Sequence, residues 1–219
     1  MSLKQKVIAI DGPSASGKGT VASRVAEALG FLYLDSGVLY RLTALYAQKQ
    51  NVAWSDEDAV STLAETLPAQ FEGSAVLLNG EDVSEQIRTE AIGMGASAVA
   101  QLPKVRTALL QRQRDFLTEK GLVADGRDIG SVIFPDAALK IFLTASANVR
   151  AQRRAKQLGI PCEGVAFERI LSDIEARDEA DRRRPVAPLK QLPDALLLDT
   201  DNLSIEEAVK KVLDWYYKV

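Results

Sequence analysis

The chain has 219 residues, of which 47% are hydrophobic, and a formal net charge of -3 at pH 7. This length suits one main domain with a small inserted subdomain. No apolar run approaches the roughly 20 residues of a membrane helix, and the N-terminal segment is too short for a signal peptide, so we expect a cytoplasmic protein. The mild negative charge argues against a nucleic-acid partner. We also expect no membrane partner and a monomeric state.

Histidine is absent, which removes the commonest general base and the commonest transition-metal ligand. The single cysteine, Cys162, excludes an internal disulfide and a multi-cysteine metal site, and we interpret it as a loop residue. Arginines concentrate between Arg150 and Arg184, a pattern that favours the clamping of small anions. Together these features favour chemistry on an anionic substrate that needs no proton abstraction.

Short apolar segments alternate with longer amphipathic ones along the chain. The short segments predict strands at Val7–Ile10, Phe31–Leu34, Leu122–Ala124, Leu139–Leu143 and Ala195–Leu198. The amphipathic segments predict helices at Thr20–Leu29, Val38–Lys49, Asp56–Leu67, Val105–Lys120, Asn148–Leu158, Ala166–Arg182 and Ile205–Tyr217. This alternation predicts an α/β fold, in which helices cover both faces of a five-stranded parallel sheet and ligands bind at the carboxyl ends of the strands.

The segment at about residues 68–97 interrupts the alternation. Its apolar pieces predict short antiparallel strands at Gln70–Glu72, Ala75–Leu78 and Asp82–Val83, and Asn79 followed by Gly80 is a strong signal for a tight turn. We interpret the segment as a small β-rich insertion on the α/β core.

The first predicted strand runs directly into a loop of small residues. Gly12 to Lys18 follow the spacing G-x-x-x-x-G-K, in which backbone amides surround phosphate oxygens and the lysine adds a positive charge. Gly19 stands where many such loops have a hydroxyl, so either Thr20 or a water bridges to Mg²⁺. The alternative is a Gly- and Ser-rich turn that binds nothing. Strand, glycines, lysine and helix nevertheless occur in the order that a nucleoside-triphosphate site requires.

Polar residues also follow the second and third predicted strands. Asp35–Arg41 begins a helix with a hydroxyl, a glycine, a tyrosine and an arginine, and Asp125, Arg127 and Asp128 follow the third strand. Because parallel strands end at one edge of the sheet, we expect these residues near a bound ligand. Alone, the second group could equally be an ordinary acidic-basic turn.

A late group of charges has spacings of four and three residues, which place its members on one helix face: Arg177, Asp181 and Arg184. Alone, such a face could equally be solvated, with routine ion pairs. Three other candidates are weaker in isolation: Arg41, Ser97 and Arg106. We interpret two further arginines as solvated charges, Arg112 and Arg114.

Several motifs together resemble the bacterial cytidylate kinase family over essentially the whole chain. They are IDGPSASGKGT, LDSGVLYR, ADGRDIGSVIFPDA, KIFLTAS and the stretch ending RRRPVAPL. The resemblance implies a P-loop NTPase fold with a core, a lid at about residues 153–166 and a monophosphate-binding region that contains the insertion. It also implies a place in pyrimidine metabolism, with phosphoryl transfer from ATP to CMP or dCMP and with Mg²⁺ bound mainly through phosphates and water.

The resemblance assigns the donor site to the loop and to two lid arginines. The expected donor-binding residues are Gly12, Pro13, Ser14, Ala15, Ser16, Gly17, Lys18, Gly19, Thr20, Arg153 and Arg154. No side chain is expected as a dedicated metal ligand.

The same resemblance assigns the acceptor site. Arg41 and Arg127 are expected to hold the acceptor phosphate. The cytosine is expected to face Ser36, Arg106, Asp128 and Arg184, and the sugar is expected near Ser97, Arg177 and Asp181. The edge residues Asp35, Tyr40 and Asp125 complete the expected acceptor site. Catalysis is expected to rest on Lys18, Arg41, Arg127 and Arg153.

Two alternatives stay open. A different small-molecule kinase on the same scaffold would phosphorylate UMP, AMP or shikimate. The base-facing residues separate these, because Asp128 beside arginines can accept a hydrogen bond from an exocyclic amine. A nucleotide-switch GTPase would be a binding module, but the chain has neither a D-x-x-G nor an N-K-x-D guanine motif.

Overall fold

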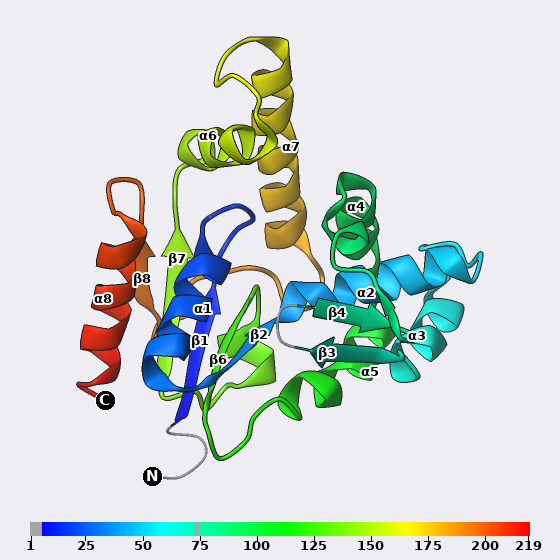
Figure 1. Ribbon diagram of the computed structural model, residues 1–219, viewed down its shortest axis with the longest axis horizontal. Coiled ribbons are helices and arrows are strands. Elements are labelled where there is room, and N and C mark those ends of the chain that lie inside the picture. Colours follow the sequence, from blue (N-terminus) through cyan, green and yellow to red (C-terminus); the bar gives the residue numbers. More distant parts are fainter. Residues whose placement is uncertain (1–5, 73–74) are drawn as a thin grey trace. The chain divides into compact units, whose positions relative to one another are not determined.

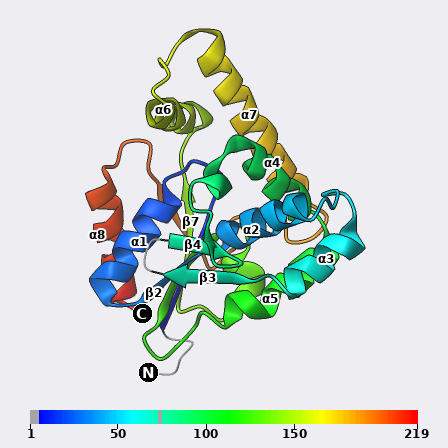
Figure 2. The same ribbon diagram turned by 45° about the vertical axis from the view of Figure 1, so that its right-hand side comes forward.

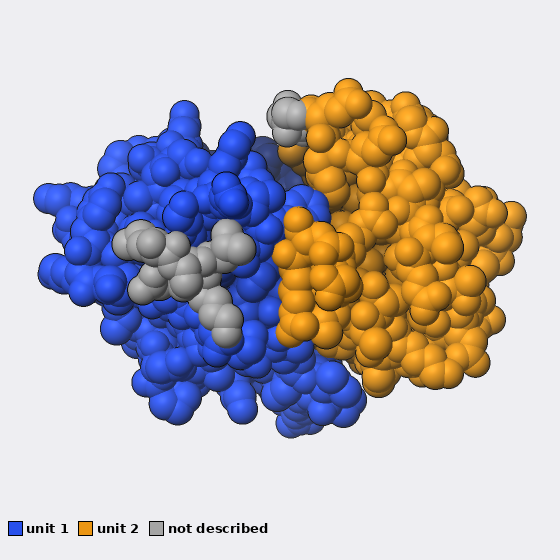
Figure 3. Space-filling view, turned by 90° about the horizontal axis from the view of Figure 1, so that it is seen from below, with its two compact units in different colours: residues 1–34, 116–219 blue, residues 35–115 orange. Residues whose placement is uncertain are grey.

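The computed structural model describes residues 6–72 and 75–219, which divide into two compact units (Figure 3). The first unit takes in the chain up to Leu34 and again from Phe116 to Val219, and the second runs from Asp35 to Asp115. The second unit therefore extends beyond the insertion expected at about residues 68–97 on both sides. The roles expected for that insertion and for the lid stay predictions.

The first unit is built on a five-stranded sheet of the predicted α/β type (Figure 1). Its strands are β1 (Val7–Asp11), β2 (Leu32–Asp35), β6 (Leu122–Gly126), β7 (Leu139–Thr144) and β8 (Leu196–Asp199). Their order is β2-β6-β1-β7-β8, and β1 pairs in parallel with both β6 and β7. The predicted strands are thus confirmed, and each extends one or two residues further at the carboxyl end, where ligands bind in such sheets.

Helical segments lie on both faces of this sheet. Helices α1 (Lys18–Leu29) and α8 (Ile205–Tyr216) lie side by side (Figures 1 and 2) and share a core with alternate strand residues such as Ile8 and Ile10. On the opposite face, Gly130 approaches Ala9, and this glycine belongs to a short π-helical turn, η3 (Ile129–Ile133). Side chains alternate between faces along a strand, so Asp11 lies on the same face as Ala9.

Two helices follow β7 in the first unit. They are α6 (Ala147–Leu158) and α7 (Gly164–Arg183). Ser146 caps α6 by accepting a hydrogen bond from the Val149 amide, and Gly159 ends it in the left-handed conformation. Cys162 is exposed in the connection to α7, as the sequence predicted.

The second unit has its own core between helices and a small sheet. Its helices are α2 (Ser36–Lys49), α3 (Glu57–Glu65), α4 (Glu90–Val99), α5 (Pro103–Arg114) and the short 3₁₀ turn η2 (Gln86–Arg88). The strands β3 (Ala69–Glu72), β4 (Ala75–Leu78) and β5 (Glu81–Asp82) form the predicted antiparallel sheet. Leu39, Leu42 and Leu109 are among its fully buried side chains.

Helix α4 begins inside the segment that was interpreted as β-rich and continues past its end, so that interpretation is wrong for residues 90–97. Two glycines in the helix resemble turn residues in the sequence but serve packing. A side chain at Gly95 would come within 2.5 Å of the Trp54 ring, and one at Gly93 would lie 3.4 Å from the Arg41 guanidinium. Small residues are needed here because large side chains from elsewhere fill the space.

Helix α5 ends six residues earlier than predicted, at Arg114 rather than Lys120. The chain instead forms a turn closed by a hydrogen bond from the Gly121 amide to the Thr118 carbonyl, directly before β6. No helix in the described residues is long and apolar enough to cross a membrane.

Candidate active site

The loop after β1 lies close against the neighbouring strand of the first unit. A side chain at Gly12 would come within 2.0 Å of the Leu143 carbonyl oxygen, so only glycine fits. The Gly12 amide donates a hydrogen bond to the Gly126 carbonyl at 3.2 Å. Ala15 and Gly17 have positive φ angles of 55° and 90°, a conformation that turns backbone amides toward an anion.

The loop and the start of α1 fit a bound triphosphate. Gly17 caps α1 without a side-chain hydrogen bond, which favours binding of an anion to the helix N-terminus. Within residues 6–72 and 75–219, the buried hydroxyls of Ser14 and Ser16 have no hydrogen-bond partner, although buried polar groups normally have one. Phosphate oxygens or a hydrated ion would satisfy them.

Lys18 is the first residue of α1 and its side chain lies over the loop. Its Nζ donates a hydrogen bond to the Pro13 carbonyl at 3.3 Å and lies 3.9 Å from Oδ2 of Asp125. The other carboxylate oxygen of Asp125 accepts a hydrogen bond from the Tyr33 hydroxyl at 2.7 Å. Asp125, expected in the acceptor site, is therefore placed beside the donor-loop lysine, and its contact with the acceptor stays a prediction.

Arg153 on α6 reaches the same loop. One guanidinium nitrogen donates to the Ser16 carbonyl at 3.0 Å, and another donates to the Thr200 carbonyl at 2.7 Å. Arg154 is partly buried on the same helix. Arg153 thus stands at the loop, where a donor phosphate would bind, and its role in closing a lid stays a prediction.

Arg150, one turn before Arg153, is a residue that the sequence did not single out. It is buried and makes a bidentate pair with Asp178 of α7, at 2.9 and 2.5 Å. It also donates to the Ser14 carbonyl at 3.1 Å. This arginine joins α6, α7 and the donor loop, and its only signal in the sequence is its place in an arginine-rich helix.

A charge cluster joins the end of β6 to the end of α7. Arg127 Nε donates to one carboxylate oxygen of Asp181 at 2.7 Å, and Arg184 pairs with the other oxygen. Burial would raise the pKa of Asp181, but the charges of Arg127 and Arg184 outweigh it and hold that pKa below its usual value. The carboxylate is therefore ionised and fixes both guanidinium groups.

The other predicted residues of this unit lie near the cluster. Asp128 is buried and directly follows Arg127, and its carbonyl accepts the Val132 amide at 2.9 Å to begin η3. Arg177 lies on α7 one turn before Asp181, and its charge also lowers the pKa of that carboxyl group. The structure thus brings together Arg127, Asp181 and Arg184, which the sequence placed in two separate groups.

The second unit contains the remaining predicted residues. The Asp35 carboxylate caps α2 by accepting the Gly37 amide at 2.9 Å, and Ser36 is buried beside it. Arg106 is buried with its guanidinium carbon 5.7 Å from the centre of the Tyr40 ring, a cation-π contact.

Arg41 of α2 lies against α4 in the same unit, and Ser97 is a residue of α4. Arg41 donates to the Ile87 carbonyl at 2.6 Å, and the Ser97 hydroxyl bonds to the Gly93 carbonyl at 3.2 Å. The sequence-based hypothesis that these residues meet those of the first unit around one acceptor stays a prediction.

Arg112 is not the solvated charge that was predicted. It donates to the Leu67 and Ala69 carbonyls, at 2.6 and 3.0 Å, and so binds the chain between α3 and β3. Its sequence position on a polar helix face gave no signal of these backbone acceptors.

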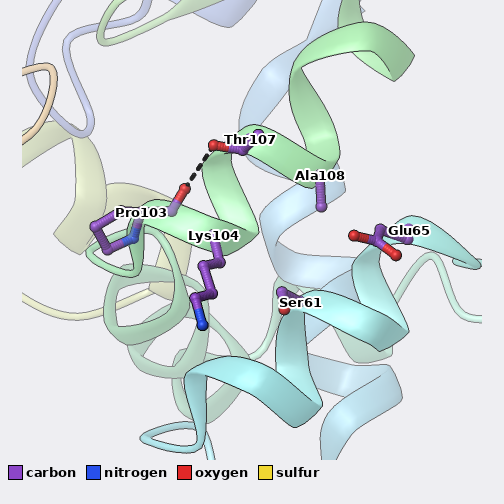
Figure 4. Close-up of a pocket in the computed structure, with 6 residues that line it drawn as sticks. All are labelled: Ser61, Glu65, Pro103, Lys104, Thr107 and Ala108. Atoms are coloured by element: carbon purple, nitrogen blue, oxygen red, sulfur yellow. Dashed lines mark hydrogen bonds between the residues drawn. The ribbon is translucent and has the colours of Figure 1, made fainter.

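A cavity of about 380 Å³ lies in the second unit (Figure 4). Its lining residues come from α3 and α5: Ser61, Glu65, Pro103, Lys104, Thr107 and Ala108. Lys104 pairs with Asp58, and none of the predicted site residues is among those that line it. We therefore assign it no part in the reaction.

Two solved structures share the fold of this chain. A gluconokinase from Sinorhizobium meliloti 1021 aligns over 98% of this chain and 93% of its own, with a TM-score of 0.52 and 16% identity. An uncharacterized protein from Eubacterium ventriosum ATCC 27560 aligns over 97% and 99%, with a TM-score of 0.54 and 10% identity. At these identities the likeness shows the fold alone. With the loop, lysine and helix described above, it defines the chain as a P-loop protein.

Sequence comparisons narrow this class. The family model for cytidylate kinase matches residues 8–218. A cytidylate kinase from Neisseria meningitidis serogroup C is 80% identical over 216 residues, covering 99% of each chain. One from Chromobacterium violaceum is 60% identical over 210 residues, covering 96% of this chain and 95% of its own. The chain belongs to the cytidylate kinase family.

Proposed function

We propose that the chain transfers the γ-phosphoryl group of ATP to CMP or dCMP, giving ADP and CDP or dCDP. The observation that supports this most directly is the match to cytidylate kinases over residues 8–218, which spans the donor loop, the β6 edge and the arginine-rich end of α7. We also propose that the enzyme acts as a monomer on small nucleotides.

The donor side follows from the loop. Backbone amides and the N-terminus of α1 bind the phosphates, and Lys18 and Arg153 supply positive charge there. Mg²⁺ bound to ATP would neutralise charge on the β- and γ-phosphates. Among the described residues, no cluster of three or more acidic or cysteine side chains could hold a metal ion. The ion is therefore proposed to bind through phosphates and water, with the loop hydroxyls of Ser14 and Ser16 within reach.

The acceptor side needs charge rather than a base. A phosphate oxygen of CMP is already anionic at neutral pH, so the absence of histidine is no obstacle to catalysis. Arginine suits such an acceptor, because its planar guanidinium grips phosphate at two points and stays charged throughout. We assign Arg127 and Arg41 to the acceptor phosphate. Asp181 orients Arg127 by accepting a hydrogen bond from the Arg127 Nε.

The base side rests on Asp128. Cytosine presents an exocyclic amine where uracil presents a carbonyl. A carboxylate therefore accepts a hydrogen bond from cytosine but is repelled by the carbonyl lone pairs of uracil. We propose that Ser36 and Arg106 complete this pocket and that Ser97 and Arg177 lie near the sugar.

A panel of acceptors tests the proposal. ADP release from ATP and Mg²⁺ is measured with CMP, dCMP, UMP, AMP and shikimate in turn. We expect kcat/KM for CMP and dCMP to exceed that for UMP by at least about 30-fold, since one charged hydrogen bond and its mismatch separate the bases. A higher kcat/KM with AMP or shikimate would assign the chain to a different P-loop kinase activity.

A further inference from the structure

Asp11 is a buried carboxylate to which the reaction described above gives no role. It is the last residue of β1, directly before the donor loop, and is 7% exposed. Its Oδ1 accepts a hydrogen bond from the Ile129 amide and its Oδ2 accepts one from the Gly130 amide, each at 2.8 Å. Both oxygens are thus bound to the first turn of η3.

The same segment is fixed at its other end by the donor loop. Asp11 is in register with Gly126 between β1 and β6, and the Gly12 amide donates to the Gly126 carbonyl at 3.2 Å. Between this bond and the two amides held by Asp11 lie only Arg127 and Asp128. The two residues assigned to the acceptor phosphate and to the base therefore project from a short stretch of chain that is anchored on both sides by Asp11 and Gly12.

We propose that Asp11 is a positioning residue for the phosphoryl acceptor. By holding the amides of Ile129 and Gly130, its carboxylate fixes the backbone from which Arg127 and Asp128 project and joins that backbone to the donor loop. The inference rests on the proposed function, because it assigns Asp11 a part in aligning the acceptor of that reaction.

The electrostatics of the site agree with such a role. Burial raises the pKa of Asp11 to about 6, while the two amide hydrogen bonds and the charge of Arg127 oppose the rise and the charge of Asp128 adds to it. At neutral pH the side chain is therefore ionised and accepts two hydrogen bonds. Burying this charge costs free energy, and such a cost persists mainly where the group is needed for function.

The amide variant Asp11→Asn tests the proposal with almost no change in volume. Its one carbonyl oxygen can accept only one of the two amides, and its NH₂ group faces the other, so the segment has to shift. Because a displacement of about 1 Å can cost up to about 100-fold, we expect kcat/KM for CMP to fall by about 10-fold to 100-fold. The KM for ATP should change by less than about twofold, because the loop contacts of ATP remain.

Two control variants separate positioning from general damage. Ile141→Val removes a methylene from the core of the same sheet and should lower stability with little change in the KM for CMP. Glu206→Gln removes an exposed carboxylate that pairs with Arg24 and should leave both KM values unchanged. If Asp11→Asn keeps a kcat/KM for CMP within about twofold of the original chain, or weakens ATP and CMP equally, the proposal is overturned.

A measurement on the unaltered chain keeps the test valid if Asp11→Asn does not fold. In ligand-free protein, NMR would follow the carboxyl carbon of Asp11 and the amides of the segment against pH. We expect the amides of Ile129, Gly130, Arg127 and Asp128 to shift with the same midpoint, near the pKa of about 6, as the Asp11 carboxyl.

If the amide chemical shifts of Arg127 and Asp128 do not change as Asp11 titrates, Asp11 is not coupled to the backbone of these two residues. The experiment uses no substrate, so it can fail or succeed independently of the acceptor panel. A chain that phosphorylates no CMP would refute the proposed function, whereas an uncoupled Asp11 would refute only this inference.

Discussion

At the scale of single residues, Arg127, which we propose binds the acceptor phosphate, is held by Asp181 of α7. Replacing Arg127 with lysine keeps the charge but removes the planar guanidinium group. The guanidinium can donate to Asp181 through Nε and still bind a phosphate at two points, whereas the lysine ammonium cannot do both. We expect Arg127→Lys to lower kcat/KM for CMP by about 100-fold, measured by steady-state kinetics.

Arg183→Lys is the matched control for this change. The Arg183 side chain is 81% exposed on the same helix as Asp181 and pairs with nearby Glu179, so Arg183→Lys should change kcat/KM by less than about twofold. Arg112, which the sequence predicted to be a solvated charge, is unsuitable as a control because it binds two backbone carbonyls. Equal, small effects of Arg127→Lys and Arg183→Lys on kcat/KM would mean that Arg127 does not bind the acceptor phosphate.

Asp128 determines the choice of base in this account. In Asp128→Asn, the amide can rotate to donate to uracil, while its hydrogen bond to cytosine loses the charge. The ratio of kcat/KM for CMP to that for UMP should therefore narrow by about 10-fold or more, mainly through lost activity on CMP. An unchanged ratio would place base recognition at other residues and leave the kinase assignment intact.

Asp181 makes stability depend on pH in a defined direction. Its pKa is lower in the folded chain than in the unfolded one, so its stabilising contribution is present above the unfolded value and is lost as pH falls through the folded value. Asp181→Asn should lower the free energy of unfolding by about 3 kcal/mol near neutral pH, because it leaves the buried Arg184 and the partly buried Arg127 facing an amide.

The difference between Asp181→Asn and the original chain should shrink once the pH falls below about 4. Urea unfolding at a series of pH values measures it. A difference that stays constant down to the acid limit would mean that the Arg127 and Arg184 contacts do not stabilise the ionised carboxylate.

At the scale of elements, the strands and most helices of the first unit followed from their hydrophobic period. Helix α4 did not, because Gly93 and Gly95 weaken its helical pattern and tight-turn signals precede it. The reason for both glycines lies in the Arg41 and Trp54 side chains that pack against them, and such long-range contacts leave no local trace in the sequence.

Helix α4 offers a direct test of that packing. A valine at position 95 would place atoms within 2.5 Å of the Trp54 ring, so Gly95→Val should lower the free energy of unfolding by about 2 kcal/mol. Met94→Val tests the cost of a β-branched residue alone, since Met94 is 63% exposed on the same helix. Similar Tm values for the two variants would show that the ring can move aside.

At the scale of the whole molecule, the donor loop could be proposed as a site from the sequence because its residues are contiguous. The acceptor residues were predicted through the family resemblance, and their contact with an acceptor stays a prediction. The structure adds the pairing of Arg127 and Arg184 with Asp181. Asp11 and Arg150 were missed, since each acts through backbone groups far away in the chain. A side chain that binds distant main-chain atoms has no sequence pattern of its own.

If the proposed function holds, the phosphoryl group passes from ATP to CMP and not to water. Phosphorus NMR of a mixture of ATP, Mg²⁺ and CMP, followed over time, measures CDP, ADP and inorganic phosphate in one experiment. We expect equal amounts of CDP and ADP with CMP present and almost no inorganic phosphate when CMP is omitted. In Lys18→Ala, which lacks the loop cation, the rate should be about 1000-fold lower. ADP formation that proceeds equally well without CMP, or that yields phosphate in place of CDP, would contradict the proposed function.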